Sequence, residues 1–440
     1  MSGRSNAIAR SALAIAMFLM CDAAVGCVAG PQTVGQSASA SASSSQEVVI
    51  QYAQWSVRSN TAVEQAVAAF NDAHSGDIRV DLLNIPLDRY QETLNMLNTS
   101  GQGPDVFELN KEWLPSYIDR GFVTNLTALL NGDPLAAYPD WAVQQAREYS
   151  PDGALYSFPT GQVTYRLLYN KDLFAQVGLD PDKPPTTLAD LTADAAAVAS
   201  YGQGKRIYGF ALPAGEFWVD VGQLMEAVNA YSGAVIYDPN RDTYDLSVYA
   251  PWLAMIQNMN SAGIMLPGMD TMSTDLAMAQ FNAGNIGIMY ASSWQASMLL
   301  GESRGFDVGV AMPPLVAANS PVGQAMVTTV GWNAINSSTE HAAAALEFFK
   351  YLESGDYLTS MERQGLAISL DPSATQYGGF AQFLPSSLDR VYPGTPLPMD
   401  EWSRKDAYES ALASPDQLQQ ILLQESDQLN TALRNSQHGS

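Results

Sequence analysis

The order of apolar and polar residues along the chain predicts strands that alternate with helices. Residues 48–55 form a short apolar run, which is typical of a buried strand. The next segment, 59–74, places Val63 and Phe70 on one helical face, and Asn60 precedes them as a suitable helix N-cap. The folded part of the chain is therefore expected to begin with a strand and a helix.

The same alternation continues through most of the chain. We predict further strands at 77–86, 104–109, 163–170, 206–212, 286–290 and 328–335, and further helices at 88–101, 170–178, 187–200, 278–285 and 414–433. Strand–helix–strand units imply mostly parallel sheets covered by helices. No fixed repeat period is visible, so the expected fold class is α/β with two lobes and not a solenoid.

Residues 1–26 have the composition of a signal peptide. Arg4 and Arg10 precede an apolar run at 11–20, and the residues before Cys27 resemble the lipobox of bacterial lipoproteins. This resemblance implies cleavage before Cys27 and acylation of its thiol, with an ordinary cleaved signal peptide as the alternative. Cys21 is the other cysteine of the chain, so the mature domain is expected to fold without disulfides or cysteine ligands.

Residues 27–47 are rich in Ser, Ala and Gln, a composition that predicts a flexible tether. The remaining part of the 440-residue chain, in which 47% of the residues are hydrophobic, is long enough for two separate cores. It contains no run of roughly 20 uninterrupted apolar residues such as a membrane span needs. The formal net charge of -24 argues against nucleic acid as a partner.

Polar and aromatic side chains gather where predicted strands end. The stretch GQGPDVFELNKEW, residues 101–113, ends a strand with Asn110, Glu112 and Trp113. Open parallel sheets bind ligands beyond the carboxyl ends of their strands, so this edge is a candidate ligand site. Tryptophans show the same tendency: Trp55 ends a predicted strand, and Trp113, Trp218 and Trp294 follow strands. Trp332 lies within a predicted strand, Trp402 precedes a helix, and Trp141 and Trp252 lie in helical patterns that favour core packing.

Indole rings beside amides and carboxylates suit a sugar. A pyranose stacks its apolar face on an aromatic ring, and its hydroxyls bind Asn, Glu, Asp and Arg side chains in pairs. Nothing in this chemistry requires a charged ligand. Polyamines and peptides would also bind indoles and carboxylates, so non-sugar solutes stay open as an alternative.

Six short motifs occur in order between residues 48 and 434. They are the strand ending in Gln54–Trp55, the segment 66–86, GxGPDV at 101–106, the segment 158–179 with YNKDLF, FNAGNIGIMYASSW at 281–294, and the helical segment 341–361. Together they resemble the extracellular solute-binding proteins of family 1, the sugar-binding lipoproteins that serve ABC importers. One departure is Ser293 before Trp294, where that family often has glycine.

The resemblance implies two lobes that close on a ligand like a hinge. Lobe one is expected to comprise 48–160 and 328–370, and lobe two 161–327 and 371–434, followed by a tail at 435–440. The partners implied are a sugar or oligosaccharide and the permease subunits of an ABC importer. We expect a monomer without cofactor or metal, held by its lipid at the outer face of the cytoplasmic membrane.

The resemblance also implies site residues. Trp55, Asn110 and Glu112 match contacts of the first lobe, and Trp294 matches the aromatic residue that stacks on the sugar from the second lobe. The other candidates are Tyr165, Trp332 and Trp402, which fall in segments that border the site, and Arg58, Trp113, Phe217 and Trp218, which stand at strand exits.

The rival class is an extracellular carbohydrate-active enzyme that works through two carboxylates. The candidate acids are Glu108, Glu112, Glu216 and Asp220, but sequence cannot supply the separation that such a pair needs. His74, His341 and His438 show no metal or triad spacing, and neither a phosphate-binding glycine-rich loop nor a GxSxG motif is present. A sugar sensor would use the same pocket and stays open as a third reading.

Overall fold

The computed structural model describes residues 47–56, 61–130, 138–216, 222–238, 240–301, 304–370, 383, 391–392 and 401–438. These residues belong to one compact unit, Ser45–Ser440. The predicted signal peptide, Cys27 with its predicted acylation, and nearly all of the predicted tether lie outside the described residues, as does the predicted N-cap Asn60.

The predicted strand and helix order is confirmed along the chain. The strands are β1 (Val48–Ser56), β2 (Ile78–Pro86), β3 (Val106–Leu109), β4 (Phe158–Asn170), β5 (Tyr208–Ala211), β6 (Tyr237–Asp238), β7 (Thr243–Tyr244), β8 (Ile286–Ser292), β9 (Val308–Ala311), β10 (Ala325–Ile335), β11 (Ile368–Ser369) and β12 (Val391–Tyr392). The helices are α1 (Thr61–Ala73), α2 (Leu87–Thr99), α3 (Leu114–Asp119), α4 (Asp140–Glu148), α5 (Lys171–Gln176), α6 (Leu188–Gly202), α7 (Gln223–Tyr231), α8 (Ala250–Ser261), α9 (Thr274–Asn282), α10 (Ser293–Gly301), α11 (Ala342–Leu352), α12 (Gly355–Arg363), α13 (Glu401–Ala413) and α14 (Leu418–His438). In the part of the chain that the structure describes, none of these helices has the length and apolar character to cross a bilayer.

The main sheet has the strand order β2-β1-β3-β10-β4-β8-β5. β1 pairs in parallel with β2 and β3, and β5 pairs in parallel with β8, as expected. The central strands differ, because β10 runs antiparallel to both β3 and β4, and β4 runs antiparallel to β8. The cause is the chain path: β4 leaves the first group of strands and β10 returns to it.

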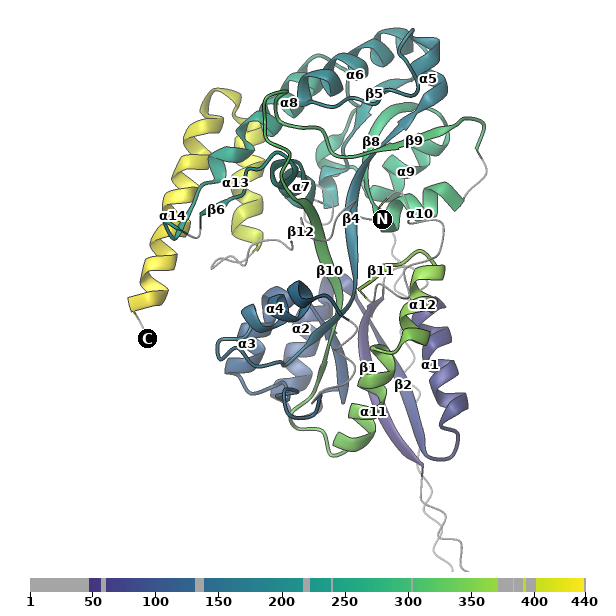
Figure 1. Ribbon diagram of the computed structural model, residues 1–440, viewed down its shortest axis with the longest axis vertical. Helices are drawn as coiled ribbons and strands as arrows, with labels where there is room; N and C mark the ends of the chain where they lie inside the picture. Colours follow the sequence, from purple (N-terminus) through teal and green to yellow (C-terminus); the bar gives the residue numbers. More distant parts are fainter. Residues whose placement is uncertain are drawn as a thin grey trace, which may run out of the picture. The chain divides into compact units, whose positions relative to one another are not determined.

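Two large hydrophobic cores lie along this sheet. The first is built from β1 to β3, α1 to α4, α11 and α12, and the second from β5, β8, α5 to α8, α13 and α14. The long strands β4 and β10 lie side by side and take part in both cores (Figure 1). Phe158 of β4 and Trp332 of β10 belong to the first core, whereas Leu167 and Met326 of the same strands belong to the second. The lobe boundaries predicted from the sequence stay a prediction.

The GxGPDV motif forms a tightly packed corner. A Cβ atom at Gly103 would lie 2.1 Å from Asn98 Oδ1 and 2.4 Å from Asn336 Nδ2, so a larger residue would displace these two paired amide side chains. The Asp105 carboxylate accepts the backbone N–H of Gln51 at 2.8 Å, and Asn336 Nδ2 donates to the Pro104 carbonyl at 3.0 Å. The motif therefore fixes β3 beside β1 and the end of β10, which sets the position of the residues that follow β3.

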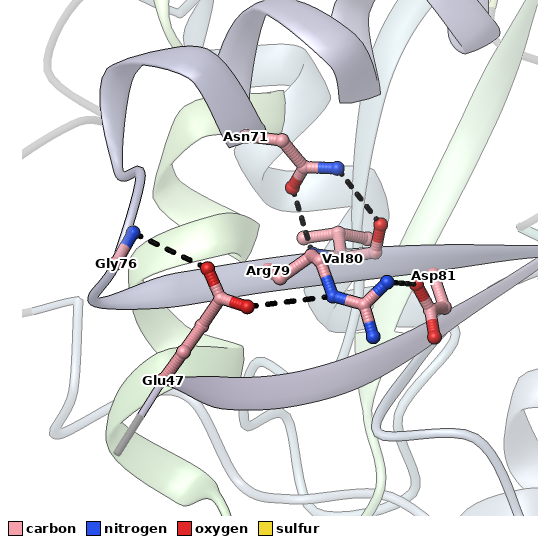
Figure 2. A network of polar contacts seen from close by, with 6 residues as sticks. All are labelled: Glu47, Asn71, Gly76, Arg79, Val80 and Asp81. Atoms are coloured by element: carbon pink, nitrogen blue, oxygen red, sulfur yellow. Dashed lines mark hydrogen bonds and ion pairs between the residues drawn. The ribbon is translucent and has the colours of Figure 1, made fainter.

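A polar network ties down the start of β1, where the predicted tether ends. The Glu47 carboxylate accepts the Gly76 N–H at 3.2 Å and lies 3.6 Å from Arg79 Nε (Figure 2). Asn71 bridges α1 and β2 by bonds to both the N–H and the carbonyl of Val80 (Figure 2). Exposed ion pairs of this kind contribute only about 0–1 kcal/mol. The network lies at the amino end of the parallel strands β1 and β2, so the carboxyl ends of these strands lie at the opposite edge of the sheet.

Candidate ligand-binding site

Three aromatic rings meet at the carboxyl ends of β1 and β3. The Trp55 ring lies 5.3 Å from Tyr90 and 6.5 Å from Trp113, both nearly perpendicular, and Tyr90 stacks on Trp113 at 6.3 Å and 24°. Tyr90 is fully buried, and its hydroxyl donates to the backbone carbonyl of Glu108 at 2.6 Å. Trp55 and Trp113 are only half-buried. The buried tyrosine thus holds two partly exposed indoles at the edge where the sequence predicts a ligand.

The turn after β3 carries the polar candidates. Asn110 caps the short 3-10 helix Lys111–Trp113, and its Oδ1 lies 3.5 Å from the backbone nitrogen of Glu112. Glu112 is exposed, so its carboxylate is free to accept hydroxyl hydrogens. The capping geometry explains why an asparagine ends this strand, since a short side chain that accepts a backbone N–H starts the turn.

Lys111 lies on the same turn and was not among the predicted site residues. It is only 8% exposed, and its Nζ lies 5.6 Å from the centroid of the Tyr149 ring. A signal for it was present in the sequence, because Lys111 stands between Asn110 and Glu112 at the strand end. Sequence reasoning gave no weight to it because lysine is normally a solvated surface residue.

Trp294 lies in the first turn of α10, directly after β8, as the motif predicts. Its indole is half-buried and packs against the second core. Ser297 Oγ lies 2.9 Å from the Trp294 carbonyl oxygen and 2.7 Å from the Gly365 carbonyl oxygen, so its single hydrogen can be donated to either and helps to fix this turn. Within the described ranges no ring contact joins Trp294 to Trp55 or Trp113.

Two other predicted residues are enclosed by protein. Tyr165 and Trp332 are each 2% exposed and belong to the second and the first core, respectively. The Trp332 indole donates its Nε1 hydrogen to Thr329 Oγ1 at 3.1 Å, and its ring meets Tyr149 at 5.8 Å. Core packing accounts for both residues, and we leave them out of the proposed site.

The remaining candidates cannot be placed. Arg58, Phe217 and Trp218 lie outside the described residues. Trp402 belongs to α13, but its side chain is not described. All four stay predictions.

Two carboxyl groups of the first core have raised pKa values. Burial raises the pKa of Glu353 to about 8, although a 2.8 Å hydrogen bond from the Tyr138 hydroxyl acts in the opposite direction. Burial also raises the pKa of Glu108 to about 8. Glu353 is 3% exposed, whereas Glu108 keeps partial exposure.

Of the four acids that the sequence offers for the rival enzyme class, the structure describes the side chains of Glu108 and Glu112. Glu108 stands in mid-sheet on β3, opposite Asn333 of β10. The Glu216 side chain and Asp220 lie outside the described part. In the residues described, no cluster of three or more His, Cys, Asp or Glu side chains could hold a metal ion.

Comparison with known proteins gives a family match over most of the fold. Residues 65–375 match the model described as "Bacterial extracellular solute-binding protein". A protein of Brucella abortus (strain 2308), named only as a binding protein, is 25% identical over 278 residues, which are 62% of this chain and 65% of that protein. The galactooligosaccharide-binding protein of Bacillus subtilis (strain 168) is 27% identical over 161 residues, 36% of each chain.

Solved structures share the fold. An ABC transporter solute-binding protein from Thermotoga lettingae, bound with alpha-D-tagatose, matches with a TM-score of 0.71 and 16% identity over 88% of this chain and 100% of its own. At this identity the likeness establishes the two-lobe α/β fold. The family match adds the class of protein: the chain belongs to the bacterial extracellular solute-binding proteins.

Proposed function

We propose that this protein captures a sugar or oligosaccharide between its two lobes for an ABC importer. The observation that carries the proposal is the pair of half-buried indoles, Trp55 and Trp113, held beside Asn110 and Glu112 at the carboxyl ends of β1 and β3. Indole faces accept the apolar face of a pyranose, and the amide and carboxylate accept or donate hydrogen bonds to its hydroxyls. The galactooligosaccharide-binding relative supports the same ligand class.

The second lobe is proposed to contribute Trp294. A ligand that touches Trp113 and Trp294 together stabilises only the arrangement in which both are close, so binding favours closure. The strands β4 and β10 are the natural hinge, because they belong to both cores. Gly331 of β10 has a φ of 68°, a conformation that favours glycine, and lies between residues of the two cores.

The remaining parts of the proposal concern the partners. The protein is proposed to act as a monomer, without catalysis, and to deliver its ligand to membrane permease subunits. A lipid on Cys27 would hold it at the outer face of the cytoplasmic membrane, with residues 28–47 as the tether.

Calorimetric titration of a glycan panel tests the ligand class. We expect at least one oligosaccharide to bind, and the same panel to show no hydrolysis or elimination products after long incubation with the protein. Turnover of a bound glycan would support the carboxylate enzyme instead. Binding of a polyamine or a peptide, with no glycan bound, would refute the sugar proposal.

Replacement of Cys27 by serine tests the attachment. The Cys27→Ser variant lacks the thiol that receives the lipid, so we expect it to leave the membrane fraction and appear in the soluble fraction. The measurement is quantitative immunoblotting after fractionation, with Cys21→Ser as the matched control that keeps membrane attachment. A Cys27→Ser variant that fractionates like the parent would contradict the lipoprotein assignment.

A further inference from the structure

Lys111 is a largely buried lysine beside the candidate site. It is more than nine-tenths buried, and it shares the three-residue turn Lys111–Trp113 with Glu112 and Trp113. Its contact with another side chain is the approach of Nζ to the Tyr149 ring at 5.6 Å. Among the residues that the structure describes, no carboxylate lies within ion-pair distance of Nζ, and Nζ donates no hydrogen bond.

This situation is unusual on physical grounds. A lysine ammonium carries three N–H donors, and lysine is almost never buried without a partner. An aromatic ring face attracts the cation but offers no hydrogen-bond acceptor. The other lysines with ion pairs in the described residues, Lys171 and Lys183, bind Asp182 and Asp180 at 2.6 and 2.9 Å. Lys111 therefore differs from these two lysines, since its ammonium group has no acidic partner among the residues that the structure describes.

The position of the charge points to the ligand as the counterpart. Lys111 follows β3 at its carboxyl end, on the same turn as the polar candidates and next to α4, whose C-cap residue is Tyr149. A solute held by Asn110 and Trp113 would lie beside this turn. An anionic group on that solute would satisfy the donors of Nζ and neutralise its charge in a partly desolvated position.

We propose that Lys111 binds an acidic group, a carboxylate or a phosphate, on the sugar that the site captures. The inference rests on the proposed sugar-binding function and narrows it from sugars in general to acidic sugars. The negative net charge of the protein repels anions at long range, so selectivity for them must arise from a local cation of this kind. The alternative role of Lys111 is structural, as a cation packed on Tyr149 that stabilises the end of α4.

Titration with matched ligand pairs tests the inference on the purified protein. The probes are glucuronate against glucose, digalacturonate against galactobiose, and galactose 6-phosphate against galactose, which separates carboxylate from phosphate. The variants are Lys111→Met, which keeps most of the apolar stem, and Lys111→Arg, which keeps the charge. Lys171→Met is the matched control, because Lys171 is also partly enclosed but is paired with Asp182 at the surface of α5.

The expected result is a preference of at least 10-fold for one acidic probe over its neutral partner. Lys111→Met should abolish this preference and change neutral binding by less than about twofold, whereas Lys111→Arg and Lys171→Met should retain it. If Lys111→Met lost the same amount of affinity for acidic and neutral probes, the inference would be overturned and sugar binding would stand. The same holds if the parent protein bound each neutral probe more tightly than its acidic partner. Failure of all six probes together with the whole glycan panel would instead refute the proposed function.

Discussion

Replacement of Trp294 by alanine is expected to weaken binding of the best oligosaccharide by about 2–4 kcal/mol, the range for removal of a buried aromatic anchor. The indole follows β8 in the first turn of α10 and is half-buried, so part of its surface remains available to a ligand. Because the proposed site is complete only when both lobes contribute, loss of this ring should also reduce ligand-induced closure. Calorimetry measures the affinity, and small-angle scattering with and without ligand measures the closure.

Two further variants keep this test specific. Trp294→Phe retains a ring and should keep a large part of the parent's affinity for the oligosaccharide. Trp113→Ala should lower this affinity, because it removes a proposed contact of the first lobe. Thermal unfolding must be similar in all variants, because Trp294 also packs against the second core. Unchanged affinity in Trp294→Ala would contradict a site that uses both lobes.

Replacement of Glu353 by glutamine is expected to stabilise the protein at alkaline pH. Burial raises the pKa of the folded-state carboxyl from 4.5 to about 8, so ionisation disfavours the folded form. The stability that the neutral carboxyl contributes is fully present below pH 4.5 and is lost as the pH rises through about 8. Each pKa unit corresponds to about 1.4 kcal/mol, and local relaxation absorbs part of it, so we expect a gain on the order of 2–4 kcal/mol at pH 9.

The difference between the variant and the parent should therefore depend on pH. Near pH 4 both side chains are uncharged, and the glutamine oxygen can still accept the Tyr138 hydroxyl hydrogen, so the two unfolding curves should nearly coincide. The midpoints in urea should separate progressively between pH 5 and 9. Glu347→Gln, at an exposed carboxylate of α11 near His74, is the control and should show no such separation. A Glu353→Gln variant that is destabilised equally at every pH would mean that the carboxyl has the same pKa in the folded and the unfolded protein, and would contradict the prediction.

The elements of the fold could be predicted from the sequence because their signals are local. Periodicity placed β1, β3 and the long helix α14 within a few residues of their observed bounds, and the GxGPDV motif identified the strand end that carries Asn110 and Trp113. Periodicity does not report strand direction across the sheet. The antiparallel pairing of β10 with β3 and β4 depends on the chain returning from the second core, which no local pattern records.

The candidate site divides in the same way. The sequence by itself determined that indoles, an amide and a carboxylate stand at strand ends, because strand ends follow from local residue patterns and side-chain types follow from residue identity. Only the tertiary structure decided that Trp332 and Tyr165 are enclosed in the cores. It also decided that Lys111 is largely buried without an acidic partner in the described residues. The hydrogen bond between Glu353 and Tyr138, which are 215 residues apart in the sequence, is a third such feature. Exposure, charge compensation and pKa depend on which distant segments come into contact, and packing of the whole chain sets those contacts.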